Sequence, residues 1–240
     1  MPDNVLALVA RFRRKIQDTG GDTGSAPIGY TYYWEYDDGD CFIPNNAVVE
    51  MLNEAQIEVC RRFPIKDDSS ALAQLGVVAG QSRYTLDPRI LAVERAYLAT
   101  TDRVLVKTYE ARIDEEDERL LLDDETRYYR VDRADNQLTL IDVPTVDETL
   151  NLSISRLPLT PLVWGDDDSV LEIGDLYIED VMLYGQYLAY STRDFDLFDA
   201  EAANVASSRF RSRVGDPRTV RDIATAREIA GTRLRIRGHY

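Results

Sequence analysis

The stretch Tyr128-Tyr129-Arg130-Val131-Asp132-Arg133-Ala134-Asp135-Asn136-Gln137-Leu138-Thr139-Leu140-Ile141 decides the fold class. Residues 128–131 and 138–141 are rich in β-branched and aromatic side chains, which favour strands. The tetrad 134–137 between them suits a tight turn, because Asp and Asn side chains readily bond to nearby backbone groups. The sequence therefore predicts a β-hairpin at this point.

Four further segments with the same texture surround this hairpin, at residues 83–86, 91–98, 104–108 and 150–155. No helical pattern interrupts the six short strands, which all lie between residues 78 and 158. Such a block is typical of a small antiparallel sandwich or barrel.

Helical patterns flank this β block on both sides, over residues 4–18, 44–63, 175–193 and 199–214. Pro44 suits the start of the second helix, since proline is favoured in the first turn. The residues expected on the buried faces are Val5, Leu8, Val9, Phe12 and Ile16, then Val48, Leu52, Ala55, Val59 and Phe63, then Ile178, Val181, Met182, Gly185, Leu188 and Ala189, and finally Ala203, Ala206, Phe210 and Val214. Arg13, Arg14 and Lys15 are expected to complement the dipole at the end of the first helix.

The predicted fold class is α+β: a small helical bundle with an inserted antiparallel β-sandwich or barrel domain and an extended basic C-terminal arm. Residues 1–76 supply the first two helices of the bundle, with a long loop at 19–42 that is first Gly-rich and then aromatic and acidic. Residues 77–162 form the inserted β domain, 163–214 the last two helices, and 215–240 the arm.

Charge is distributed unevenly along this chain, whose formal net charge is −15. Residues 205–240 carry nine arginines, three acidic residues and no lysine, which leaves 19 basic and 40 acidic residues in the remainder. This asymmetry is typical of an arm that docks on a negative partner, and arginine suits two-pronged contacts with carboxylate or phosphate. The candidate partner-binding residues are Arg209, Arg211, Arg213, Arg218, Arg221, Arg227, Arg233, Arg235 and Arg237.

Recognisable motifs for catalysis, cofactors and metals are absent from the sequence. The single histidine, His239, lies next to the C-terminus without a neighbouring nucleophile. Cys41 and Cys60 are not at metal-ligand spacing, and the chain has no P-loop, GxSxG or helix-opening GxGxxG motif. We therefore expect no enzymatic activity, no cofactor and no metal site.

Acidic clusters at residues 37–40, 114–118, 123–125 and 166–168 leave one catalytic alternative open. Two carboxylates that meet in space could hydrolyse a glycoside. None of the clusters matches a calcium-binding loop with its later Glu. In so acidic a chain, solvated turns account for such clusters more simply.

Four tyrosines of the third helix spread around more than one of its faces: Tyr177, Tyr184, Tyr187 and Tyr190. They could pack within the subunit, or they could form a subunit interface, where tyrosine is enriched. Both interpretations stay open.

Composition also indicates the cellular compartment in which the protein is expected. No apolar run approaches the ~20 residues that cross a bilayer, so we expect no membrane partner. Residues 1–10 lack the basic segment of a secretory signal. Two cysteines do not make a disulfide framework, so a reducing cytosolic origin is expected.

The segment Leu52-Asn53-Glu54-Ala55-Gln56-Ile57-Glu58-Val59-Cys60-Arg61-Arg62 resembles the head–tail adaptor (connector) proteins of tailed bacteriophages, in which a helix of the form LNEAQxExxRR precedes a β-rich middle. Residues 84–91, 138–140 and 150–152 continue the resemblance, as does 189–196 at the end of the third helix. The resemblance implies a structural homo-oligomeric ring, commonly a dodecamer, bound beneath the capsid portal. It also implies a C-terminal segment that reaches the portal protein, and a further tail or neck component on the other side.

The location that the resemblance implies is the head–tail junction of the virion, after assembly in the host cytoplasm. An acidic body suits a ring around a DNA channel, because like charge lets genomic double-stranded DNA pass without specific binding. Two other functions stay open: a virion-associated peptidoglycan-degrading enzyme with a carboxylate pair, and a nucleic-acid-binding module that acts through the arginine-rich arm.

Overall fold

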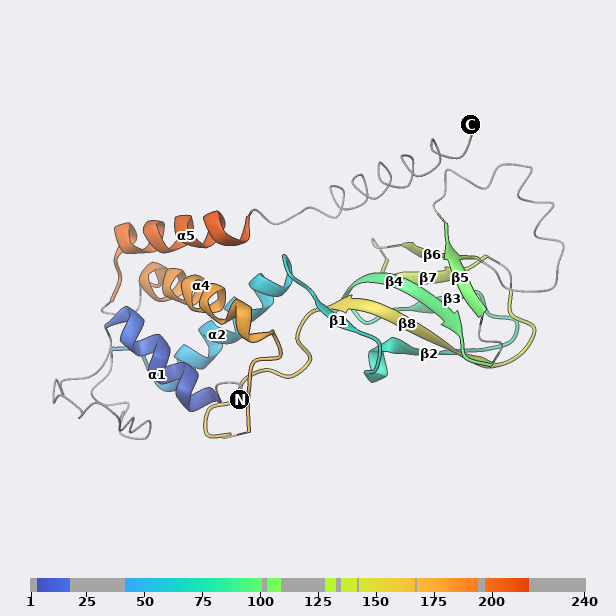
Figure 1. Ribbon diagram of the computed structural model, residues 1–240, viewed down its shortest axis with the longest axis horizontal. Coiled ribbons are helices and arrows are strands. Elements are labelled where there is room, and N and C mark those ends of the chain that lie inside the picture. The colour runs from blue at the N-terminus through green and yellow to red at the C-terminus, as the bar shows by residue number, and fades with distance from the viewer. Residues whose placement is uncertain are drawn as a thin grey trace, which may run out of the picture. The chain divides into compact units, whose positions relative to one another are not determined.

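The computed structural model describes residues 4–17, 42–100, 103–108, 128–132, 135–141, 143–166, 168–193 and 197–215. The fold is α+β (Figure 1). The chain divides into two compact units, a helical unit made of Met1–Phe63 with Thr160–Tyr240, and a β unit made of Pro64–Leu159.

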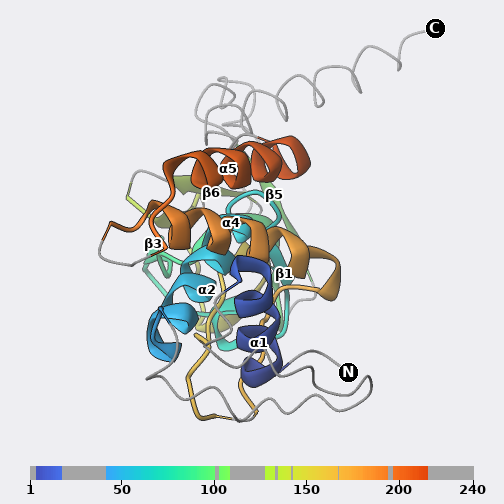
Figure 2. The same cartoon turned by 90° about the vertical axis from the view of Figure 1, so that its left-hand side faces the viewer.

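The described part of the helical unit contains four α-helices: α1 (Val5–Ile16), α2 (Asn45–Cys60), α4 (Ile178–Ser191) and α5 (Ala200–Val214), with a short 3-10 turn, η5 (Asp175–Tyr177), leading into α4. Helix α4 lies between α5 and the α1–α2 pair and contacts all three (Figure 2). The predicted helices are confirmed. Their predicted apolar faces are buried, except that Phe63 and Leu188 are half-buried.

Helices α1 and α4 approach each other closely because α4 carries Gly185 at their contact. A Cβ atom at this position would lie 2.8 Å from Cε2 of Phe12, whose ring is fully buried. Any larger residue would therefore have to displace the Phe12 ring from the core.

Arg13 lies in the last turn of α1, as the sequence predicts, and is buried completely. Its Nη2 donates to the carbonyl oxygen of Ile43 at 2.7 Å and to Oδ1 of Asn45 at 2.6 Å. Its Nε also donates to Oδ1 of Asn45, at 3.2 Å. The guanidinium thus ties the end of α1 to the first residue of α2, and buried polar groups depend on such partners.

The β unit contains eight described strands: β1 (Ile65–Asp67), β2 (Gln74–Val77), β3 (Arg83–Thr85), β4 (Ile90–Leu98), β5 (Arg103–Lys107), β6 (Tyr128–Asp132), β7 (Gln137–Leu140) and β8 (Glu148–Arg156). They form one curled sheet in the order β1-β8-β4-β5-β6-β7-β3, and β2 also pairs with β8. Inward residues alternate along the strands to build the core, as Leu150, Leu152 and Ile154 do in β8.

The predicted hairpin is confirmed: β6 and β7 pair antiparallel across a turn in which Asn136 has a φ of 50°. All six predicted strands are present. The sequence missed β1 and β2, both of which pair antiparallel with β8. The compact β unit accordingly starts at Pro64, earlier than the boundary at residue 77 that the sequence predicts.

One pairing differs in direction from the prediction, because β5 and β6 run parallel and the sheet is therefore mixed. Parallel neighbours need a crossover of a dozen or more residues. The connection between Lys107 and Tyr128 has that length. The composition of the two strands alone does not indicate whether they pair parallel or antiparallel. The pairing of β4 with β8 shifts register twice along β4, and such irregularities bend a strand.

Parts of the sequence predictions fall outside the described residues. These are the 19–42 loop up to residue 41 and the arm from residue 216 onward. Within the described part of the chain, no helix is both long and apolar enough to span a membrane.

Replacing Arg13 tests whether its hydrogen bonds to Ile43 and Asn45 stabilise the contact between α1 and α2. Arg13→Met keeps most of the apolar stem but leaves buried oxygens of Ile43 and Asn45 without this donor, so we expect the free energy of unfolding to fall by about 2–3 kcal/mol. Urea unfolding followed by the helical circular dichroism signal measures the loss. Arg14→Met is the matched control: Arg14 is exposed on the next position, so its loss should stay within about 0.5 kcal/mol.

Candidate functional site

Polar residues of the segment 52–62 join α2 to distant parts of the chain. Asn53 pairs with the backbone of Leu162 in both directions, accepting from its N–H at 2.7 Å and donating to its carbonyl at 3.0 Å. Oε1 of the buried Gln56 accepts from the N–H groups of Glu172 and Ile173, at 2.8 and 3.3 Å. These two side chains hold the segment that returns to the helical unit from the β unit.

Arg62, at the end of α2, binds the end of α5. Its side chain is 7% exposed. It donates from Nε to the carbonyl oxygen of Gly215 at 3.0 Å and from Nη1 to Oε1 of Glu58, and its guanidinium lies 4.8 Å from the centre of the Phe210 ring. One planar cation therefore fixes an acidic partner, an aromatic ring and a backbone carbonyl together.

Gly215 ends α5 with a φ of +77°, a conformation that favours glycine. Arg62 therefore holds the point from which the predicted arm departs. Six of the candidate partner-binding residues lie beyond this point, outside the described residues: Arg218, Arg221, Arg227, Arg233, Arg235 and Arg237.

The other three candidate arginines are exposed on the last turns of α5. Arg209 and Arg211 flank the buried Phe210 on its two sides, as residues about 100° apart around a helix do. Nε of Arg213 donates to Oδ1 of the buried Asp180 at 2.6 Å, and this hydrogen bond, together with the charge of Asp180, raises the pKa of Arg213. Arg213 thus already contributes to packing within the subunit.

The four candidate interface tyrosines are all half-buried. The Tyr177 ring stacks on Phe63 with centroids 4.8 Å apart, and the Tyr184 ring lies 5.0 Å from Phe210 and 5.5 Å from Tyr187. Burial, and then the charges of Glu58 and Glu54, raise the pKa of Tyr184; burial and Asp199 do the same for Tyr190. Packing within the subunit thus involves at least three of them, while a subunit contact stays a prediction.

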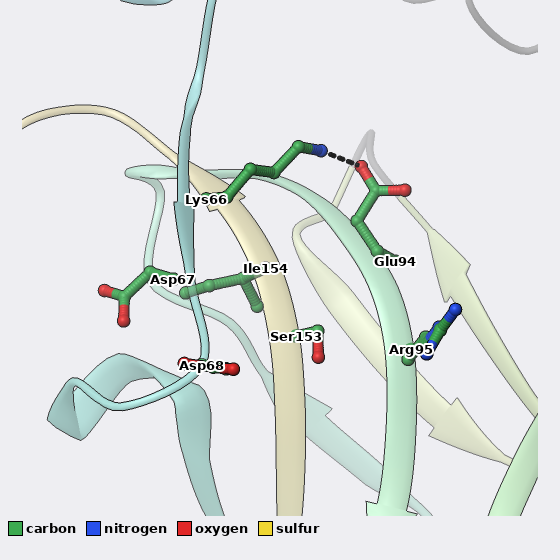
Figure 3. Close-up of a pocket in the computed structure, with 7 residues that line it drawn as sticks. All are labelled: Lys66, Asp67, Asp68, Glu94, Arg95, Ser153 and Ile154. Carbon is green, nitrogen blue, oxygen red and sulfur yellow. Dashed lines mark hydrogen bonds and ion pairs between the residues drawn. The ribbon is translucent and has the colours of Figure 1, made fainter. Parts of the chain in front are cut away.

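The β unit has an open pocket of about 480 Å³, lined by Lys66, Asp67, Asp68, Glu94, Arg95, Ser153 and Ile154 (Figure 3). Nζ of Lys66 lies 3.0 Å from Oε1 of Glu94 and donates to Oγ of Ser155 at 2.6 Å. Oγ of Ser155 in turn donates to the same Glu94 oxygen at 2.9 Å. The cation, hydroxyl and carboxylate therefore satisfy one another.

Asp67, another acidic residue of the pocket wall, forms a largely buried ion pair with Arg156. Burial alone would raise the pKa of the Asp67 carboxyl. The neighbouring Ser70 hydroxyl, the N–H groups of Ser69 and Ser70 and the Arg156 guanidinium nevertheless lower this pKa well below its ordinary value. A carboxylate so stabilised in its charged form is a poor general acid.

The acidic clusters of the sequence analysis give no assembled centre among the described residues. Asp166 and Asp168 are joined in a turn by an N–H to carboxylate hydrogen bond of 3.2 Å, while the other three clusters lie outside the described ranges. In the part of the chain that the structure describes, no group of three or more His, Cys, Asp or Glu side chains is placed to hold a metal.

The segment 52–62 thus connects several parts of the helical unit. It is also the segment whose sequence resembles the head–tail adaptor proteins. The family model described as SU10 adaptor protein matches residues 3–237. The chain belongs to the SU10 adaptor protein family. The match covers both compact units and most of the arm, and it is consistent with a phage head–tail adaptor. Among curated proteins, no relative matches this SU10 adaptor family member.

Replacing Arg62 by lysine should loosen α5. Lysine keeps the charge but loses the planar fork, so we expect the protection of α5 amides against hydrogen exchange to fall by about 1–2 kcal/mol. Arg61→Lys is the control, because Arg61 is 58% exposed and pairs with the same Glu58. Equal effects of the two substitutions would contradict the role assigned to Arg62.

Acid should destabilise the β unit through Asp67. Its pKa is lower in the folded state than the ordinary 3.8, so its contribution is fully present above pH 3.8 and is lost as the pH falls from there toward the lowered pKa. Unfolding measured between pH 5 and pH 2 should show a shallower decline for Asp67→Asn than for the wild type. Asp68→Asn, at the exposed neighbouring position, should change the free energy of unfolding at pH 5 by no more than about 0.5 kcal/mol.

Proposed function

We propose that this protein is a structural component of a tailed-bacteriophage virion that forms a ring and joins the capsid portal to the tail. The observation that carries the proposal is the SU10 adaptor match over residues 3–237. The contacts of the segment 52–62 support it, since Asn53 and Gln56 of α2 and Arg62 just beyond it join distant parts of the helical unit. These are the roles of a building block, and the proposal includes no enzymatic step.

The arginine-rich arm is proposed to dock on the portal protein. It follows Gly215 in the sequence, shortly after the exposed Arg209 and Arg211, so basic residues continue from the end of α5 into the arm. Many copies that engage one platform gain avidity from modest single contacts. A dodecameric ring would present such a set of arms together.

The acidic body is proposed to surround the DNA channel. With 40 acidic against 19 basic residues outside positions 205–240, its charge has the same sign as the phosphate backbone. Like charge keeps the genome from adhering while it passes. A further tail or neck component would bind the other side of the ring.

The mass of the purified protein, measured alone and with the portal protein of the same phage, tests this function. We expect the portal to collect a closed ring of copies. No complex with the portal, together with activity against peptidoglycan or tail-dependent binding to duplex DNA, would overturn the proposal in favour of one of the two alternatives.

Reversing the charge of the arm should prevent attachment. The triple variant Arg233→Glu, Arg235→Glu, Arg237→Glu is expected to lose portal binding at least about tenfold, the change that ~1.4 kcal/mol produces, while its circular dichroism spectrum stays unchanged. The control reverses three exposed arginines of the β unit, Arg83, Arg89 and Arg95, with the same change in net charge. Undiminished binding by the arm variant would contradict the docking role.

A further inference from the structure

Among the described residues, one acidic residue of the segment 52–62 has no hydrogen-bond or ion-pair partner. Asn53, Gln56, Glu58, Arg61 and Arg62 all have partners in the same chain. Glu54 is exposed, and among the described residues nothing pairs with it. No hydrogen bond or ion pair among the described residues therefore accounts for an acid at this position, although burial and, after it, the charges of Glu58 and Glu54 raise the pKa of the Tyr184 hydroxyl.

Glu54 belongs to an exposed strip of α2, which we term the acidic strip: Glu50, Glu54 and Ile57. Residues three and four positions apart are neighbours on a helix surface. Glu50 is likewise exposed and unpaired within the described ranges, and Ile57 is 36% exposed. The strip therefore offers two free carboxylates and an apolar contact.

A strip of opposite sign lies on α5, which we term the basic strip: Val205, Arg209 and Arg213. They follow one another at spacings of four, so they share one side of the helix. Val205 is 45% exposed, and Arg213 keeps a half-exposed side chain although it pairs with Asp180. Arg209 is exposed and forms no ion pair with any described residue.

The two strips are complementary, since each combines an exposed aliphatic side chain with charge of one sign that no described residue pairs, on Glu50 and Glu54 in the acidic strip and on Arg209 in the basic strip. Both lie on the same compact unit, so every copy of the chain carries both. A surface that complements a different surface of an identical molecule makes a head-to-tail contact, and such contacts form a ring when the rotation from copy to copy closes. Complementary charge across an interface also fixes register and suppresses wrong pairings.

We infer that the acidic strip of one subunit binds the basic strip of the next, with Glu54 facing Arg209 of the neighbouring copy. This inference rests on the proposed ring and specifies its lateral contact. Ile57 and Val205 supply the apolar part of the same interface. The contact is made by the helical unit and leaves the arm beyond Gly215 free for the portal.

Charge reversal at either strip tests the contact, with mass photometry of the protein assembled on the portal as the measurement. Glu54→Arg alone and Arg209→Glu alone should each raise the concentration needed for half-assembly by about tenfold, because each turns an attraction into a repulsion at every interface. Both positions are exposed, so thermal unfolding of the variants should match the wild type. Asp68→Arg and Arg83→Glu, exposed on the β unit, serve as controls and should assemble normally.

Rescue distinguishes this pairing from other causes of failure. An equimolar mixture of the two single variants should assemble, since alternating copies restore opposite charges at every interface. The double variant Glu54→Arg, Arg209→Glu should assemble as well. Restoration in the mixture requires a contact between different copies, which a contact within one subunit cannot supply.

Three results would overturn the inference while the ring survives: normal assembly of the single variants, impaired single variants without rescue, or an effect of Glu54→Arg without an effect of Arg209→Glu. The last would show that another cation, such as one from the arm, occupies the acidic strip. Failure of the wild type to form a ring on the portal would instead reject the proposed function, and the inference with it.

Discussion

The constraint on which the helical unit depends is the return of the chain to a core that it left at Phe63. Helix α2 has to recognise a segment that arrives about a hundred residues later, and it does so with the amide side chains of Asn53 and Gln56. An amide that both donates and accepts satisfies backbone groups that no regular structure satisfies there. Helix α4 can then enter between α5 and the first two helices, with Gly185 against Phe12.

Much of the secondary structure could be predicted, because it depends on local periodicity. The four helices, their buried faces and the 128–141 hairpin follow from spacing and turn chemistry that span fewer than twenty residues. The missed strands β1 and β2 have three and four residues, too short for a pattern. The parallel β5–β6 pair depends on a long-range register that strand texture does not encode.

The candidate site was less predictable, since its residue types were visible while their partners were not. Arg61 and Arg62 are adjacent and equivalent in the sequence, yet the Arg61 side chain is 58% exposed and the Arg62 side chain only 7%. Arg13 lies at the end of a helix as the sequence predicts, but its acceptors in Ile43 and Asn45 are 30 and 32 residues further along the sequence. Conversely, Tyr177 of η5 and Tyr184 of α4, two of the tyrosines that suggested an interface, pack against Phe63 and Phe210 within the subunit.

The pairing of β1 with β8 has a consequence for how such a chain can diversify. Ile65 and Arg156 are opposite each other in the sheet, so the first and last strands of the β unit start and finish side by side. The helical unit therefore accommodates this whole insertion as a closed loop with a short span, and the entropy of closing a loop depends only weakly on its length. Related chains can consequently exchange or enlarge the inserted module without rebuilding the scaffold that carries it.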